Sequence, residues 1–336
     1  MKKLAVLLPT YNASPYIKSS IDSLLDQTFS DFDIYIYDDF STDDTSEIID
    51  SYNHPRIFYR KNESNLGIAK TLNKGLEELL FHYEYIARMD ADDWCFSERF
   101  EKQLEYLENN LDTVICGTQG YWLKDIELTP KKGWTYPTNF EYIKYYLLFA
   151  ATFGHSSIVL RTQKFIDFNL RYDETITTCE DWELWIRVSN IGKLSNLDDF
   201  LMKYRILENS NHRSPEKIKK HLKERSKIIS SYWNDLGHRF TEQEIYKLYF
   251  GGKENSKALF YSNLKKLIKA FNIVFFDANS CLSNNDNKNF SFMLARKVLN
   301  YWKRSGMSKL NPIVWFLILK EVRFRTKINL IKSIIR

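Results

Sequence analysis

The stretch from Glu84 to Trp94 constrains the fold of this chain more than any other part of the sequence. A short, mostly apolar run ends there in three closely spaced carboxylates, Asp90, Asp92 and Asp93. A run of this length between helical patterns is typical of a buried strand in a parallel sheet. Acids that follow such a strand project into the crevice where open α/β sheets bind ligands. Because neighbouring acids repel one another unless a cation lies among them, the motif predicts a ligand or metal site, with a solvated acidic turn as the alternative.

Two further predicted strands end in residues suited to ligand binding: Leu4–Leu8 precedes the turn 9–12, and Asp33–Tyr37 precedes an acidic pair. Helices and strands alternate around them. The expected helices run from Pro15, capped by Ser14, to Gln27, from Asp43–Asp44 to Tyr52, from Gly67 to His82 and from Ser97 to Asn109; the other strands are Ile57–Tyr59 and Thr113–Gly117. This order predicts an α/β fold with a doubly wound, mostly parallel sheet and helices on both faces. The three turns then share one edge of the sheet, which independent solvated turns have no reason to do.

Charge and motif content exclude several classes of function. Residues 320–336 contain six Lys or Arg and one Glu, so this tail carries the whole net charge of +5 and residues 1–319 sum to zero. The body of the chain therefore lacks the charge of a nucleic-acid-binding surface. GxGxxG and GxxxxGK[ST] are both absent, which excludes the Rossmann and P-loop sites. The four cysteines are scattered without a CxxC pair, which argues against zinc and favours a reducing compartment. No apolar run suits a signal peptide or a membrane span, so we expect a cytoplasmic protein.

Five short segments follow one another in a characteristic order: Pro9–Asn12, Gln27–Phe29, Tyr37–Asp43, Asn65–Gly67 and Asp90–Asp93. In this order and at this spacing they resemble the bacterial family 2 glycosyltransferases, which are inverting enzymes with the GT-A fold, a mixed but mostly parallel sheet. The resemblance covers about residues 3–210. One departure is Phe40, where the family usually has glycine or asparagine.

The resemblance implies a nucleotide site and a metal site. The nucleotide of a UDP-sugar donor would contact Pro9, Thr10, Tyr11, Asn12, Asp38, Asp39, Arg88, Asp90 and Ala91. Asp92 would hold Mn²⁺ or Mg²⁺, cations that carboxylates usually bind with positions left open for water and phosphate. For Arg88, a buried ion pair with one of these acids is an equal alternative.

The resemblance also implies a catalytic base. Glu180-Asp181 precedes an aromatic helix, and Asp181 would take the proton of the acceptor hydroxyl as that hydroxyl attacks the sugar. The alternative is that both acids simply suit the start of a helix.

The residues expected to line the donor-sugar and acceptor pocket are Glu180, His155, Trp182 and Arg205. A histidine with a partner in the core is the alternative for His155. Leu207 stands where the family often has histidine, so Arg205 or His212 would have to supply a contact to the diphosphate. A wall on which a sugar stacks is expected from Trp122, Trp134 and Tyr136.

The C-terminal part of the chain contains no catalytic motif. We predict a catalytic domain at 1–214, with a nucleotide-binding half at 1–118 and an acceptor half at 119–214, followed by a helical region at 215–336. Its expected helices are Glu216–Trp233, Glu242–Phe250, Ser256–Phe271 and Phe290–Arg304, with a loop at 280–289. The basic amphipathic tail 312–336 is typical of a helix that rests on an anionic membrane surface. Packing on the catalytic domain and a homodimer contact are the alternatives.

The sequence therefore predicts an inverting, metal-dependent transfer of a hexose or N-acetylhexosamine from a UDP-sugar to a hydroxyl group. The acceptor would be a saccharide or lipid-linked saccharide of a cell-surface glycan such as O-antigen, capsule or lipooligosaccharide. The enzyme would work in the cytoplasm or on the inner face of the cell membrane. Two rival functions stay open: a metal-dependent phosphotransferase, which would need its acids after the first strand, and an inactive membrane-associated scaffold.

Overall fold

The computed structural model describes residues 2–124, 132–206, 215–250, 262–266 and 268–274. The chain divides into two compact units. The first, the sheet unit, comprises Met1–Ile143 and Ala150–Arg213, and the second, the helical unit, comprises Lys144–Phe149 and Ser214–Arg336. The predicted domain boundary lies between 214 and 215.

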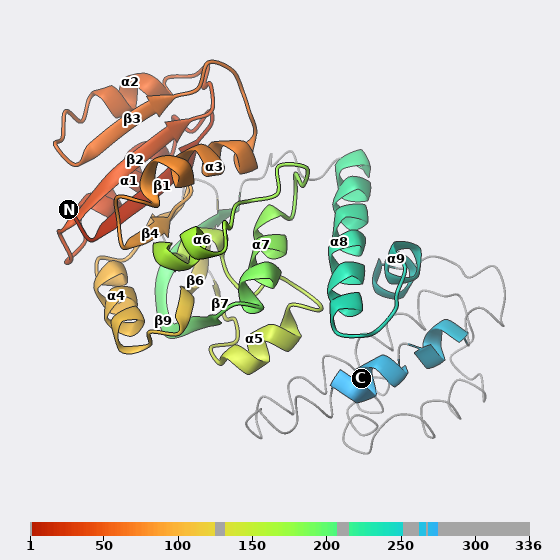
Figure 1. The fold of residues 1–336 in the computed structure, drawn as a ribbon. Helices are drawn as coiled ribbons and strands as arrows, with labels where there is room; N and C mark the ends of the chain where they lie inside the picture. The colour runs from red at the N-terminus through yellow and green to blue at the C-terminus, as the bar shows by residue number, and fades with distance from the viewer. Residues whose placement is uncertain (1, 125–131, 207–214, 251–261, 267, 275–336) are drawn as a thin grey trace. The chain divides into compact units, whose positions relative to one another are not determined.

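The sheet unit is built on a mixed sheet, whose described part has nine strands in the order β3-β2-β1-β4-β8-β6-β9-β5, with β7 paired to β6 (Figure 1). The strands are β1 (Leu4–Thr10), β2 (Phe32–Asp38), β3 (Ile57–Lys61), β4 (Tyr85–Arg88), β5 (Trp94–Cys95), β6 (Thr113–Lys124), β7 (Lys132–Trp134), β8 (Val159–Arg161) and β9 (Lys193–Ile206). β1 to β4 pair in parallel, and β8 is antiparallel to both β4 and β6. The predicted α/β fold with a mixed sheet is confirmed.

Helices cover both faces of this sheet. They are α1 (Ile17–Leu25), α2 (Thr45–Asp50), α3 (Ile68–Leu79), α4 (Arg99–Asn109), α6 (Thr162–Asp167) and α7 (Glu180–Ser189), while α5 (Phe140–Tyr146) begins in the sheet unit and ends in the helical unit. Alternate β1 side chains such as Val6 belong to one core with α1 and α4, because successive side chains of a strand point to opposite faces. Leu7 points the other way, toward α3, where a Cβ on Gly75 would lie 2.2 Å from Leu7 Cδ1. Glycine at 75 therefore lets α3 lie close to the sheet.

One local expectation is wrong, and one strand was not predicted. α1 begins at Ile17 rather than at Pro15, and Ser14 does not cap it. The N–H group of Ser14 instead donates to Asp43 (3.0 Å), which ties this segment to the turn after β2. In addition, β8 lies between β4 and β6, where no strand was expected. Three residues are too few to show a hydrophobic period, and their antiparallel direction breaks the pattern of alternating strands and helices.

The helical unit contains α8 (Pro215–Asp235) and α9 (Glu242–Phe250), and residues 262–266 and 268–274 are also helical. Its core is aromatic: Trp233 stacks on Phe271 with a centroid distance of 5.9 Å and donates its indole N–H to Tyr249 (2.9 Å). α9 has the predicted bounds. The predicted helix 290–304, the loop 280–289 and the tail 312–336 lie outside the described residues. Within the described ranges, no helix has the length and apolar character needed to cross a bilayer.

Candidate active site

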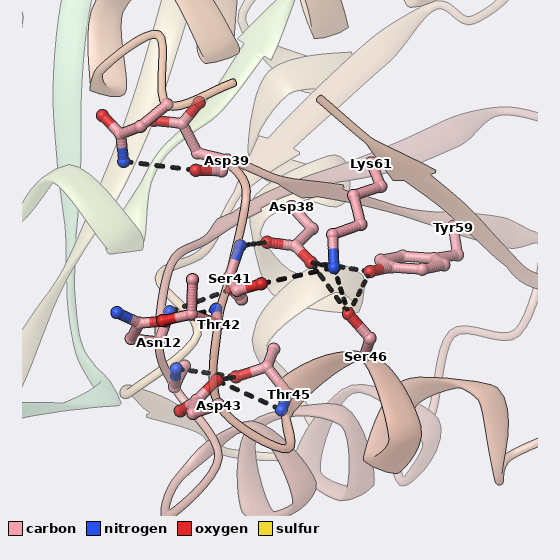
Figure 2. Close-up of polar contacts among 12 residues, drawn as sticks. Asn12, Asp38, Asp39, Ser41, Thr42, Asp43, Thr45, Ser46, Tyr59 and Lys61 are labelled. Carbon is pink, nitrogen blue, oxygen red and sulfur yellow. Dashed lines mark hydrogen bonds and ion pairs between the residues drawn. The ribbon is translucent and has the colours of Figure 1, made fainter. Parts of the chain in front are cut away.

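The turns after β1 and β2 are fastened to each other, as expected for neighbouring parallel strands. Asp39 donates its N–H to the carbonyl of Thr10 (2.8 Å). Further along, Asn12 donates its N–H to Ser41 Oγ (2.9 Å), and its side-chain oxygen accepts from the N–H of Thr42 (2.9 Å; Figure 2). Pro9 and Thr10 end β1, and Tyr11 is 53% exposed just beyond it. The hydroxyl of Thr10 is buried and has no hydrogen-bond partner within the described residues.

Asp38 lies inside this pair of turns. Its carboxylate is fully buried and accepts hydrogen bonds from Ser41 N (2.8 Å), Ser46 Oγ (3.2 Å) and Tyr59 OH (2.6 Å). Lys61 Nζ lies 3.8 Å away (Figure 2). Burial and Asp38 together raise the pKa of Tyr59, so this tyrosine is a donor at neutral pH. Every one of these contacts is internal, which gives Asp38 a role in shaping the turn.

Asp39 connects the turn after β2 to the segment before α3. Its carboxylate accepts the N–H groups of Leu66 (2.8 Å) and Gly67 (2.8 Å) and the side-chain amide of Asn62 (2.9 Å). Gly67 has φ +85°, which glycine adopts without strain. The motif Asn65–Gly67 recognised in the sequence is therefore the segment that Asp39 holds beside the turns after β1 and β2.

The three acids after β4 form one cluster. Carboxylate oxygens of Asp90, Asp92 and Asp93 all lie within 4.8 Å of one another, with Ala91 buried between the first two. Asp93 accepts the backbone N–H of Arg205 (2.9 Å), and its other carboxylate oxygen is buried without a hydrogen-bond partner among the residues that the structure describes. Oxygen donors in this arrangement suit a hard divalent cation such as Mg²⁺ or Mn²⁺.

The electrostatics of the cluster point the same way. Burial and the charge of Asp90 raise the pKa of Asp92 to about 6, and burial and the charge of Asp92 raise the pKa of Asp93 well above its usual range. The charge of Arg205, whose Nε donates to the carbonyl of Asp92 (2.7 Å), opposes the shift at Asp92. The nearby arginines therefore do not fully neutralise these carboxylates, and the residues present fit a divalent cation.

Arg88 forms the buried ion pair with Asp90 that the sequence left as one of its two alternatives. The guanidinium is 4% exposed and also donates to Ser156 Oγ (2.9 Å), which in turn donates to Asp90 (2.9 Å). Although burial opposes its charge, Asp90 raises the pKa of Arg88 further. The ion pair fixes the orientation of Asp90.

Glu180 and Asp181 form the first turn of α7, close enough to the acid cluster to feel its charges. Burial raises the pKa of Asp181; Arg88 opposes this shift and Asp90 adds to it. Burial and the charge of Asp181 raise the pKa of Glu180 to about 7. Asp181 Oδ1 also accepts the N–H of Trp182 (2.7 Å). The two predicted roles of Asp181, helix start and base, are therefore compatible in one geometry.

The other predicted pocket residues differ in their surroundings. His155 pairs through Nε2 with Tyr172 OH (2.9 Å), and burial holds its pKa well below the usual range, so the ring is neutral. Trp182 is only 3% exposed and offers little surface to a sugar. The rings expected to form a wall, Trp122, Trp134 and Tyr136, contact one another in a chain that Tyr204 extends, with centroid distances of 5.5, 6.0 and 5.0 Å from Tyr204 to Tyr136. Leu207 and His212 lie outside the described residues.

Arg99 and Gln103 form a buried pair on α4 that was not predicted and that holds the backbone next to the site. Arg99 is fully buried and donates to the carbonyl of Arg88 (2.9 Å), the carbonyl of Ile158 (3.2 Å) and the side chain of Gln103 (3.0 Å). Gln103 donates in turn to the carbonyl of Ser157 (2.9 Å). The pair ties β4 to the segment that supplies Ser156. Its signal was an arginine and a glutamine four residues apart on the apolar face of a helix.

Comparison with known proteins adds independent findings. The model of the family "Glycosyl transferase family 2" matches residues 5–168. An uncharacterized glycosyltransferase of Methanocaldococcus jannaschii is 32% identical over 257 residues, which cover 74% of this chain and 85% of the relative. The structure of S. aureus TarS 1-349 in complex with UDP-GlcNAc has a TM-score of 0.55 at 19% identity and covers 90% of both chains. A mannosyltransferase from Pyrobaculum calidifontis in complex with GDP-Man and Mn²⁺ has a TM-score of 0.52 at 12% identity, over 99% of this chain and 88% of that one. At these identities the two structures are evidence of a shared fold.

Proposed function

The chain belongs to glycosyltransferase family 2, and we propose that it transfers a hexose or N-acetylhexosamine from a UDP-sugar to a hydroxyl group with inversion at the anomeric carbon. One observation carries the proposal. Acids from the end of β4 and from the start of α7, distant in sequence, lie close to the same guanidinium, that of Arg88, beside the turns after β1 and β2. A metal-dependent transferase needs these parts together: a nucleotide site, a cation site and a base.

The nucleotide is proposed to bind at the ends of β1 and β2, where Thr10 ends the first strand and Tyr11 beyond it has an exposed ring. The backbone of Pro9, Asn12 and Asp39 borders this proposed site. Asp38 holds the turn after β2 in shape through its hydrogen bond from Ser41 N–H. Binding of UDP-GlcNAc by TarS, which shares the fold, supports a UDP-sugar as donor.

Asp181 is proposed as the base. Its raised pKa makes it a stronger base than an ordinary aspartate. As the acceptor oxygen attacks C1 of the sugar from the face opposite the diphosphate, its proton passes to Asp181. The bond from C1 to the diphosphate oxygen breaks, and its electron pair leaves with UDP. Attack from the opposite face inverts the configuration at C1. Glu180, with its own pKa near neutrality, lies beside the base and is proposed to orient the acceptor.

Asp90, Asp92 and Asp93 are the residues that would hold Mn²⁺ or Mg²⁺. When bound, such a cation stabilises the negative charge that develops on the departing diphosphate. Arg88 orients Asp90 for this task, and Arg205 fixes Asp92 and Asp93 through hydrogen bonds to their backbone and side chain. The Mn²⁺-bound mannosyltransferase of the same fold supports a divalent cation here.

The acceptor is proposed to be a saccharide or a lipid-linked saccharide of a cell-surface glycan, on the cytoplasmic face of the membrane. The chain of rings from Tyr204 to Tyr136 is the proposed surface on which an acceptor sugar stacks. A peripheral membrane contact through residues 312–336 belongs to the same proposal.

The test is UDP release from UDP-glucose, UDP-galactose and their N-acetyl forms by the full chain with Mn²⁺. Wild type is compared with Asp92→Ala and with Asp26→Ala, a matched control at an exposed acid outside the cluster. We expect wild type and the control to hydrolyse one of the donors. Asp92→Ala should hydrolyse none of them, and EDTA treatment should abolish the activity of wild type. Absence of UDP-sugar binding in the presence of Mn²⁺ would overturn the donor assignment and favour the scaffold. Proton NMR of the transferred sugar, once an acceptor is found, tests inversion directly.

A further inference from the structure

Phe40, in the turn after β2, has an unusual backbone conformation. Its φ of +71° lies in the left-handed region, which places the Cβ of most residues too close to the backbone. The other non-glycine residues with positive φ in the described part of the chain are Asn12, Asn53 and Asn169, and asparagine tolerates this region. A bulky aromatic residue there is strained.

Packing inside the protein does not explain the residue. The side chain of Phe40 is 44% exposed, and within the described ranges no aromatic or cationic group stacks on its ring. The backbone on either side is fixed by others: Asp39 N–H by Thr10, and Ser41 N–H by Asp38. The fold therefore imposes the left-handed conformation at position 40 but gains little packing from a phenyl ring. Glycine or asparagine would adopt this conformation with less strain.

The position of Phe40 supplies a reason for the ring. The turns after β1 and β2 are joined at two levels, by the bond from Asp39 N–H to Thr10 and by the bond from Asn12 N–H to Ser41. Tyr11 and Phe40 both lie between these levels, one in each turn, and both are among the exposed large hydrophobic residues, Tyr11 at 53%. Two exposed rings in facing turns offer flat apolar surfaces to a heterocyclic base, which stacks well on aromatic side chains.

We propose that Phe40 is a binding residue of the nucleotide site: its ring packs on the base of the donor nucleotide, together with Tyr11, and this contact offsets the backbone strain of a phenylalanine at position 40. The inference rests on the proposed function, since it takes the ligand at this edge to be a nucleotide. It adds a contact that glycine or asparagine at this position cannot make.

The test separates strain from binding by measuring both in the same variants of the full chain. Phe40→Asn removes the ring and suits the backbone, so its thermal midpoint should equal or exceed that of wild type. Its Kd for UDP, measured calorimetrically with Mn²⁺, should rise roughly fivefold to 150-fold, the range expected from the loss of one stacking contact. Phe40→Tyr keeps the ring and should retain the affinity. Phe81→Asn, at a ring that is 64% exposed outside the site, should leave it unchanged.

A ligand without a base provides the internal control. The Kd for inorganic pyrophosphate with Mn²⁺ should be the same in wild type and in Phe40→Asn, because Phe40 is proposed to contact only the base. If wild type binds UDP and Phe40→Asn binds it equally well, the inference is wrong while the proposed function stands. If wild type binds ADP, GDP or CDP instead of UDP, and Phe40→Asn raises the Kd for that nucleotide, the inference is supported and the UDP assignment fails. Absence of binding to all four nucleotides would overturn both.

Discussion

Replacement of Asp38 by alanine should strongly destabilise the sheet unit, because the carboxylate is fully buried and binds three donors. Truncation leaves the buried N–H of Ser41 without an acceptor, which costs about 1–3 kcal/mol. Ser46 and Tyr59 are only half-buried, so their hydroxyl groups regain water, and each lost bond to the carboxylate costs about 1 kcal/mol. We therefore expect a loss of about 3–5 kcal/mol, a large fraction of the stability of an ordinary domain. Asp38→Asn keeps an oxygen for Ser41 and should cost about 1–2 kcal/mol.

The assay is urea unfolding followed by circular dichroism, with Asp44→Ala as the matched control. Asp44 lies in the same turn, is exposed and makes no side-chain cap to α2. UDP binding is then measured under conditions where Asp38→Asn is fully folded, and its Kd should stay within roughly threefold of wild type. A stable, folded Asp38→Asn that no longer binds UDP would show that the carboxylate contacts the nucleotide directly, as the resemblance first suggested. An alanine variant no less stable than the control would refute the energetic reasoning.

Three further predictions follow from the same geometry. Asp181→Asn should lower kcat by about a hundredfold or more with UDP affinity retained; a larger loss in Glu180→Gln, measured in the same transfer assay, would move the base to Glu180. His155 is neutral in the native state because its pKa is depressed, so the unfolded chain takes up a proton first as the pH falls below about 6.5. The difference in unfolding free energy between wild type and His155→Gln should therefore shrink from about pH 7.5 to pH 5, by at most about 1.4 kcal/mol per pH unit. A difference that does not change with pH would contradict a neutral His155 in the native state. Gly120→Ala would bring a Cβ within 2.4 Å of Trp134 and 2.9 Å of the carbonyl of Met202, so urea unfolding should show a loss of about 1–3 kcal/mol.

The parts of the fold that could be predicted from sequence are those whose hydrophobic pattern is local. The strands at Leu4–Thr10 and Tyr85–Arg88 are apolar runs that end in polar turns, and parallel pairing brings those turns together. β8 could not be predicted, because a three-residue strand has no period and its place between β4 and β6 depends on long-range pairing.

The candidate site shows the same division at the level of side chains. Asp90 and Asp181 could be singled out because their motifs occupy short stretches. The partners that orient them could not: Ser156 lies sixty-six positions from Asp90, and Tyr172, the partner of His155, stands in no motif. Asp38 illustrates a different difficulty. Asp38 and Asp39 look like ligand-binding acids in sequence, and only the structure shows that donors of the protein itself surround both carboxylates.

The balance of charge explains why the site needs residues from so many elements. Its carboxylates come from the turn after β4 and the start of α7, and two arginines, Arg88 and Arg205, lie close enough to stabilise their ionised forms. Even so, burial and mutual repulsion raise the pKa of Asp92 to about 6 and of Glu180 to about 7. Two fixed arginine charges are therefore insufficient for the set of acids, and a third full charge on the protein would bury another ion at high energetic cost. A divalent cation that binds together with the diphosphate would complete the balance only when the donor is bound, so we expect metal binding and donor binding to depend on each other.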